Sequence, residues 1–138
     1  MTLRDYAARQ VDVLMNRVAA QVDRLAEARD ADAIHDFRVS IRRLTQSLRA
    51  FAGVLPKKES KQVRKEMKVL MDLAGEVRTR DIALELFDAA KVPPDSAPCV
   101  RLALEREDAI AELSAAAARW RGTDFVSRWR SMLKAGSE

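Results

Sequence analysis

Residues 35–51, HDFRVSIRRLTQSLRAF, decide how the chain is expected to fold. On a helical wheel that advances by about 100° per residue, this segment has two distinct faces. One face is apolar and consists of Phe37, Ile41, Leu44, Leu48 and Phe51. The other is a stripe roughly 80° wide that contains His35, Arg38, Arg42, Gln46 and Arg49. The pattern predicts a helix that buries its apolar face and holds a separate row of cations.

The arginines of this stripe have no acidic neighbour on their own helix. A surface helix normally offsets an arginine with Asp or Glu three or four residues away. None of the residues at those spacings from Arg38, Arg42 or Arg49 is acidic, whereas Arg24 has Glu27 within reach. Like charges at this spacing destabilise a helix by about 0.2–0.5 kcal/mol per pair, and a bound anion would remove that cost. A basic stripe on one helix is more often a solvated face than a binding site, but a second adjacent stripe without acidic partners would favour an anion-binding surface.

A second cationic stripe follows on the next predicted helix. It consists of Lys61, Arg64, Lys65 and Lys68, and the connection before it adds Lys57 and Lys58. Only Asp72 stands four residues from one of the cations in the second stripe. A short connection implies that the two helices are antiparallel neighbours, so we expect both stripes to border one groove.

Helical periodicity continues along nearly the whole chain. It predicts six helices, over residues 2–28, 32–52, 58–74, 77–90, 96–121 and from 123 onward. The expected starts and stops are caps at Thr2, Asp32, Asp95 or Ser96, and Thr123, with Pro98 in a first turn and interruptions at Gly53, Gly75 and Gly122. The fold class is thus all-α: a compact bundle of about five to six antiparallel helices with one strongly basic face. We expect a single domain over residues 1–138.

The positive charge is concentrated in one part of the chain. The net charge is +4, yet residues 34–80 alone carry twelve basic and five acidic side chains. The lone Cys99 has no partner for a disulfide and no Cys or His at zinc-site spacing, which indicates a small buried residue in a reducing compartment. No run approaches the ~18 apolar residues of a membrane span, and the N-terminus does not resemble a signal peptide. These features predict a cytoplasmic location and no membrane partner.

Two segments of the chain also resemble motifs of a known family. The run AIHDFRVSIRRLTQSLRAF resembles the signature of the CHAD family, the conserved histidine α-helical domain, whose pattern is approximately H-x-x-R-V-x-x-R-R-L-R-x-x-L-R-x-F. The matching positions are His35, Arg38, Val39, Arg42, Arg43, Leu44, Leu48, Arg49 and Phe51. A second motif, L-G-x-V-R-D-x-D, resembles LAGEVRTRDIALELF, with matches at Gly75, Val77, Arg78 and Asp81. Two positions depart from these motifs: Thr45 replaces an arginine and Thr79 replaces an aspartate.

The resemblance implies binding of inorganic polyphosphate, often on polyphosphate granules, through basic side chains along a groove or pore. It implies that His35, Arg38, Arg42 and Arg49 are ligands, supported by Arg43 and Arg78. The cations Lys61, Arg64, Lys65 and Lys68 match only the basic character of the family's next helix. Family members usually have two consecutive bundles with facing basic surfaces, and this chain resembles the first of them. We therefore expect either a homodimer that completes the basic pore or a piece of a longer protein.

Two other classes of function use the same features differently. Nucleic-acid binding, or a scaffold for phosphoproteins, is the alternative use of the basic face. Proteins that bind single strands generally stack bases on aromatic rings, and no aromatic side chain interrupts either stripe. Nonspecific binding to duplex nucleic acid is therefore the alternative that remains. We expect no enzyme, because the chain lacks a Gly-rich phosphate loop, a second histidine and an acidic cluster near the stripes. No metal or cofactor is expected, and we interpret ERED at 105–108 as a solvated helix face.

Overall fold

The computed structural model describes residues 1–137, with side chains described as far as Ser131. The helices of this part of the chain are α1 (Leu3–Leu25), α2 (Ala31–Ala50), α3 (Lys57–Ala89), α4 (Ala97–Gly122) and α5 (Phe125–Ser137). No strand occurs among these residues. The expectation of an all-α fold is confirmed.

The first two helices begin at side-chain caps. Thr2 and Asp5 form the predicted capping box, in which the Thr2 hydroxyl accepts a hydrogen bond from the Asp5 amide at 3.1 Å. The start of the second helix was predicted at Asp32, and that prediction is wrong. Asp30 Oδ1 instead accepts from the Ala33 amide at 2.9 Å, and α2 begins at Ala31. Asp32 then lies in the first turn, where its negative charge interacts favourably with the positive end of the helix dipole.

The longest helix, α3, runs through Gly75 without a break. The sequence predicted two helices that end and restart at this glycine, and that prediction is wrong because one helix extends over 33 residues. A glycine inside a helix costs about 1 kcal/mol relative to alanine. Burying a single Val or Met side chain contributes about 1.5–3 kcal/mol, and Val63, Met67, Leu70 and Val77 of this helix are all buried. Packing therefore overrides the local preference.

The boundary between α4 and α5 also differs from the prediction. Ser96 occupies the N-cap position of α4 and Pro98 lies in its first turn, as predicted, but the Ser96 side chain makes no capping hydrogen bond in the described structure. Thr123 was predicted to cap the last helix but instead follows the end of α4, where its hydroxyl donates to the Trp120 carbonyl at 2.6 Å. At the start of α5, Phe125, Val126 and Trp129 are buried. The side chains of Met132 and Leu133, which would continue this apolar face, lie outside the described residues.

All the helices contribute to one hydrophobic core. The predicted apolar face of residues 35–51 is confirmed, since Phe37, Ile41, Leu44 and Leu48 are buried and Phe51 packs against the core. Cys99 is also buried, as expected. Because the apolar face of α2 turns inward, its opposite face is left on the outside of the bundle.

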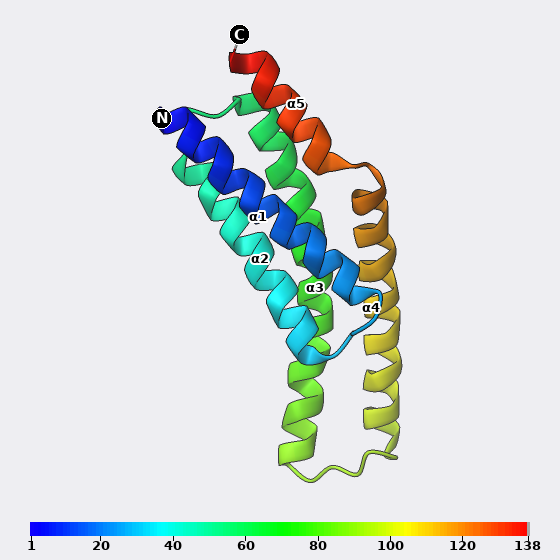
Figure 1. Ribbon diagram of the computed structural model, residues 1–138. Helices are drawn as coiled ribbons and strands as arrows, with labels where there is room; N and C mark the ends of the chain where they lie inside the picture. The colour runs from blue at the N-terminus through cyan, green and yellow to red at the C-terminus, as the bar shows by residue number, and fades with distance from the viewer. Residues whose placement is uncertain (138) are drawn as a thin grey trace.

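The chain forms two helical hairpins that pack on each other (Figure 1). α1 and α2 run antiparallel, and α2 lies beside the N-terminal part of α3, which runs in the opposite direction. α3 and α4 form a longer hairpin whose connecting loop projects beyond the lower ends of α1 and α2 in this view. The two cationic helices are thus antiparallel neighbours, as the short connection implied.

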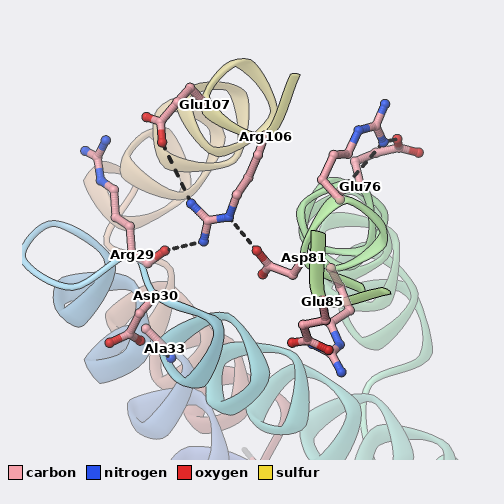
Figure 2. A network of polar contacts seen from close by, with 10 residues as sticks. Arg29, Asp30, Ala33, Glu76, Asp81, Glu85, Arg106 and Glu107 are labelled. Carbon is pink, nitrogen blue, oxygen red and sulfur yellow. Dashed lines mark hydrogen bonds and ion pairs between the residues drawn. The ribbon is translucent and has the colours of Figure 1, made fainter. Parts of the chain in front are cut away.

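A buried ion pair joins α3 and α4 next to the loop between α1 and α2 (Figure 2). Arg106 Nε on α4 donates to Asp81 Oδ1 on α3 at 2.5 Å, and Arg106 Nη2 donates to the Arg29 carbonyl at 2.7 Å. The two charged side chains are only 16% and 8% exposed. The expectation of a solvated face at residues 105–108 is therefore wrong for Arg106. Its partners lie 25 and 77 residues away in the sequence, so no local pattern could show them.

Candidate anion-binding groove

A groove of about 580 Å³ lies between α2 and α3, and we call it the basic groove. Its lining comes from these two helices and consists of Ile41, Arg42, Thr45, Gln46, Arg49, Lys61, Arg64, Lys65, Met67, Lys68, Met71 and Asp72. Six of these side chains are basic and one is acidic, which gives the lining a formal charge of +5. The two cationic stripes therefore meet on opposite sides of one hollow.

A second hollow, the Arg38 pocket, continues the basic groove along α3. Its volume is about 660 Å³, and its lining is Arg38, Met71, Asp72, Gly75, Glu76, Arg78, Thr79 and Ile82. Met71 and Asp72 line both hollows, so the two adjoin at this turn of α3. Arg38 and Arg78, which stand 40 residues apart in the sequence, are brought to the same pocket.

Arg38 has a buried guanidinium nitrogen without a partner. Its Nε is shielded from solvent and makes no hydrogen bond within the described structure. Burial, together with the like charges of Arg42 and Arg78, lowers the pKa of Arg38. A buried polar atom is normally hydrogen-bonded, and leaving its bond unmade costs about 1–3 kcal/mol. An anion held beside these three arginines would reduce the repulsion among their charges. Arg64 of the basic groove has an unpartnered buried Nε as well.

The cations of the basic groove lack acidic partners in the described part of the chain. Arg42, Arg49, Lys61, Arg64 and Lys65 make no ion pair there. Lys68 is the exception, with its Nζ 2.8 Å from Asp72 Oδ2. Elsewhere, interhelical ion pairs join Arg24 to Asp36, Arg121 to Asp23, Arg130 to Asp12 and Arg106 to Asp81. The acids that are missing at helical spacing are therefore not supplied by the tertiary structure either.

A comparison with protein families matches residues 9–138, nearly the whole chain, to the CHAD domain. The chain belongs to the CHAD family. Searches of the curated proteins and of the solved structures found no match for it.

The first CHAD motif is divided between two sides of α2. Arg42 and Arg49 line the basic groove and Arg38 lines the adjoining pocket. His35 is exposed and lines neither hollow. Arg43 lines a different hollow between α1 and α2, beside Arg17 and Asp36. Consecutive helical residues point about 100° apart, so Arg42 and Arg43 do not face the same neighbour.

The second CHAD motif is divided between the site and the fold. Arg78 lines the Arg38 pocket, with its Nη1 3.5 Å from Glu85 Oε1. Val77 is buried in the core, and Asp81 forms the buried pair with Arg106. Thr79, at a position where the family has aspartate, makes no ion pair; its hydroxyl donates to the Gly75 carbonyl at 3.0 Å. Of the two charged residues that match the motif, Arg78 lies at the candidate site and Asp81 does not; Glu76, between two matching positions, also lines the Arg38 pocket.

Several residues of the groove were not among the predicted ligands. Gln46 lines the groove, and its position on the predicted cationic stripe of α2 could have indicated this from the sequence. Asp72 was visible in the sequence as the acid four residues from Lys68, a pairing that the structure contains. Met71 borders both hollows, which makes part of the floor apolar. Its position could be found only after α2 and α3 were placed side by side.

Among the described residues, no three side chains of His, Cys, Asp and Glu gather in an arrangement that could hold a metal ion. None of the described helices has a stretch that is both long enough and apolar enough to cross a bilayer.

Proposed function

We propose that this CHAD domain binds inorganic polyphosphate along the basic groove and the Arg38 pocket. The observation that carries the proposal is Arg38, whose buried Nε lacks an acceptor while two further arginines repel it. Membership of the CHAD family is consistent with polyphosphate as the ligand. The shape of the site also suits a linear polyanion, because the two hollows adjoin along α3 and do not form one closed cavity.

The proposed mechanism is charge neutralisation by two kinds of cation. Arginines Arg38, Arg42 and Arg49 can donate paired hydrogen bonds to phosphoryl oxygens, whereas lysines Lys61 and Lys65 act as mobile point charges. Each contact releases counterions from the polymer, so binding should weaken steeply as salt rises. Repulsion among the groove cations, present in the free protein, falls when the anion binds. The relief of this repulsion therefore contributes to the free energy of binding.

The apolar part of the lining favours this ligand over single-stranded nucleic acid. Ile41, Met67 and Met71 are the apolar residues of the basic groove, and none is aromatic. Sequence-tolerant single-strand binders stack bases on aromatic rings. Nonspecific binding to duplex DNA, which needs only phosphate contacts, is the second candidate function.

A competition experiment separates polyphosphate from duplex DNA. A fluorescent polyphosphate is bound to the protein at fixed salt and displaced with either unlabelled polyphosphate or duplex DNA of matched total charge. We expect polyphosphate to displace the probe at far lower concentration. Equal displacement by the two polymers would support a general phosphate-backbone binder and contradict the proposal.

We propose a binding module without turnover, acting in the cytoplasm at polyphosphate granules. Phosphate release from purified protein and polyphosphate would contradict the absence of turnover. We also propose that two chains can meet with their basic faces turned toward each other when polyphosphate lies between them. The ligand is required for that arrangement, because two linings of formal charge +5 repel each other without it.

A further inference from the structure

The α3–α4 hairpin, residues 82–112, bears large apolar side chains on its surface. Ile82 and Leu86 on α3 are 42% and 64% exposed, and Leu104 on α4 is 62% exposed. The loop end of this hairpin projects beyond α1 and α2, so neither helix covers it (Figure 1). Isolated exposed apolar residues are common on proteins, but several on one projecting element are typical of an interaction surface.

The face of α3 that carries Ile82 and Leu86 also carries Arg64 and Lys68 of the basic groove. On a wheel with Gly75 at zero, Arg64, Lys68, Ile82 and Leu86 all fall within about 20° of it. This face is therefore basic before Gly75 and apolar after it. A second copy of α3, running antiparallel across the first at Gly75, would bring the apolar half of each helix onto the basic half of the other.

Gly75 is suited to such a crossing. Within the described structure nothing requires glycine there, because an added Cβ would meet no atom within 4 Å and the φ of Gly75 is not positive. The residue lines the Arg38 pocket and is partly exposed. A helix without a side chain at this point lets a second backbone come close.

The charges of the two surfaces are complementary. Residues 82–112 contain seven acidic and three basic side chains, a net charge of −4. Asp88, Asp95, Asp108 and Glu112 of this hairpin form no ion pair within the described structure. The basic groove, with its lining charge of +5, has unpartnered cations. A hairpin with apolar residues and excess acid fits a groove with excess base and an apolar floor.

We propose that, without polyphosphate, the α3–α4 hairpin of a second copy of this chain docks on the basic groove, with a twofold axis near Gly75. The contact is isologous, since each chain donates its hairpin and receives the other. Polyphosphate then competes with the hairpin for the same cations. Only this competition rests on the proposed function; the self-association does not. The dimer differs from the polyphosphate-bridged one, in which two basic faces meet.

Molar mass measured by light scattering tests the self-association. The wild-type chain at low salt, without polyphosphate, should show a dimer that dissociates as salt rises. Leu86→Lys should raise the dissociation constant roughly tenfold or more, because it would bury an unpaired cation beside other cations. Gly75→Leu should also weaken the dimer, while thermal unfolding of the monomer shifts upward because leucine is the better helix former. A wild-type chain that is monomeric at low salt and tens of micromolar overturns the proposal.

A charge exchange between two variants tests the pairing of hairpin and groove. One variant, Glu85→Lys with Asp108→Lys, reverses two exposed acids of the hairpin. The other, Lys61→Glu with Lys65→Glu, reverses two exposed lysines of the groove. Each should be monomeric alone, and an equimolar mixture should form heterodimers, because every reversed hairpin then meets a reversed groove. Failure of the mixture to associate, with both variants folded by circular dichroism, contradicts this interface.

The competition is tested with sodium tripolyphosphate, whose three phosphoryl groups leave little chain to bridge two proteins. It should dissociate the wild-type dimer into monomers at a concentration that leaves ionic strength nearly unchanged. A dimer that persists while tripolyphosphate is shown to bind overturns the competition. If tripolyphosphate and long polyphosphate both fail to bind, the proposed function is wrong. The self-association still stands or falls by the salt dependence of the molar mass and by the charge exchange.

Discussion

Arg38 and Arg106 are two partly buried arginines of one helical bundle that differ in what neutralises them. Arg106 donates to the Asp81 carboxylate and to the Arg29 carbonyl, so its charge is satisfied within the chain. Arg38 has a buried Nε with no acceptor in the described structure, and burial together with the charges of Arg42 and Arg78 lowers its pKa. The first residue holds α3, α4 and the α1–α2 loop together. The second adds strain that no part of the described chain relieves.

The difference separates arginines of the fold from arginines of the site. A buried charge is tolerated in a stable fold when its partner is buried with it. A row of cations without partners destabilises the free protein and becomes favourable only when an external anion arrives. The lack of an acidic partner in three dimensions, which a sequence motif cannot show, is the reason we propose Arg38 as a ligand residue and Arg106 as a residue of the fold.

The largest effect expected from this comparison is on stability at Arg106. Arg106→Ala should lower the free energy of unfolding by about 3–5 kcal/mol, because Asp81 would stay buried without its cation. Urea unfolding measures the change. Arg121→Ala is the matched control, since its pair with Asp23 is also interhelical but exposed and should cost less than about 1 kcal/mol. Similar losses in the two variants would remove the distinction between buried and exposed pairs.

The next effect concerns affinity at Arg38. Arg38→Ala should weaken polyphosphate binding roughly ten- to a hundredfold, as expected for the loss of charge-assisted hydrogen bonds worth about 1.5–3 kcal/mol. Stability should stay unchanged or rise, since no partner is lost and repulsion by Arg42 and Arg78 is relieved. Titration calorimetry at fixed salt, paired with urea unfolding, measures both.

Arg43→Ala is the control for this variant, because Arg43 belongs to the same motif but lines the hollow on the α1 side. It should keep nearly full affinity. If Arg43→Ala loses as much affinity as Arg38→Ala, polyphosphate also contacts the α1 side of α2, and the proposed limit of the binding site to the basic groove and the Arg38 pocket is wrong.

A smaller effect is expected at the lysines of α3. Lys65→Ala should reduce the slope of log affinity against log salt concentration by about one, because one fewer counterion is released. Affinity should change similarly for polyphosphates of different length above the groove's span. The measurement is a salt titration of both proteins with one polyphosphate. An unchanged slope would mean that Lys65 does not contact the polymer.

The smallest effect is expected at the ion pair between Lys68 and Asp72 in the groove. Asp72→Asn should tighten polyphosphate binding by less than about fivefold, since the exposed pair with Lys68 is weak. The change removes an acid from the lining and frees Lys68 for the ligand. Weaker binding in this variant would show that Asp72 positions Lys68 and does not compete with the polymer.

Local patterns were sufficient for the helices and for their two faces. The spacing of Phe37, Ile41, Leu44 and Leu48 predicted the buried face of α2, and the spacing of Lys61, Arg64 and Lys68 predicted the outer face of α3. Both follow from a period of 3.6 residues, which depends on neighbours within two turns. The same local reasoning failed at Gly75, where a weak propensity was outweighed by apolar burial along both halves of α3.

The sequence by itself therefore determined which residues form helices, which faces are apolar and which are cationic. Only the tertiary structure decided which cations share a groove, because that depends on which face of α2 lies next to α3. It separated Arg38, Arg42 and Arg49 from Arg43 and His35, although one motif contains them all. It also gave Arg106 its partners, Asp81 and the Arg29 carbonyl. The physical reason is that a charge is balanced by what lies near it in space, and helical periodicity specifies neighbours only along one helix.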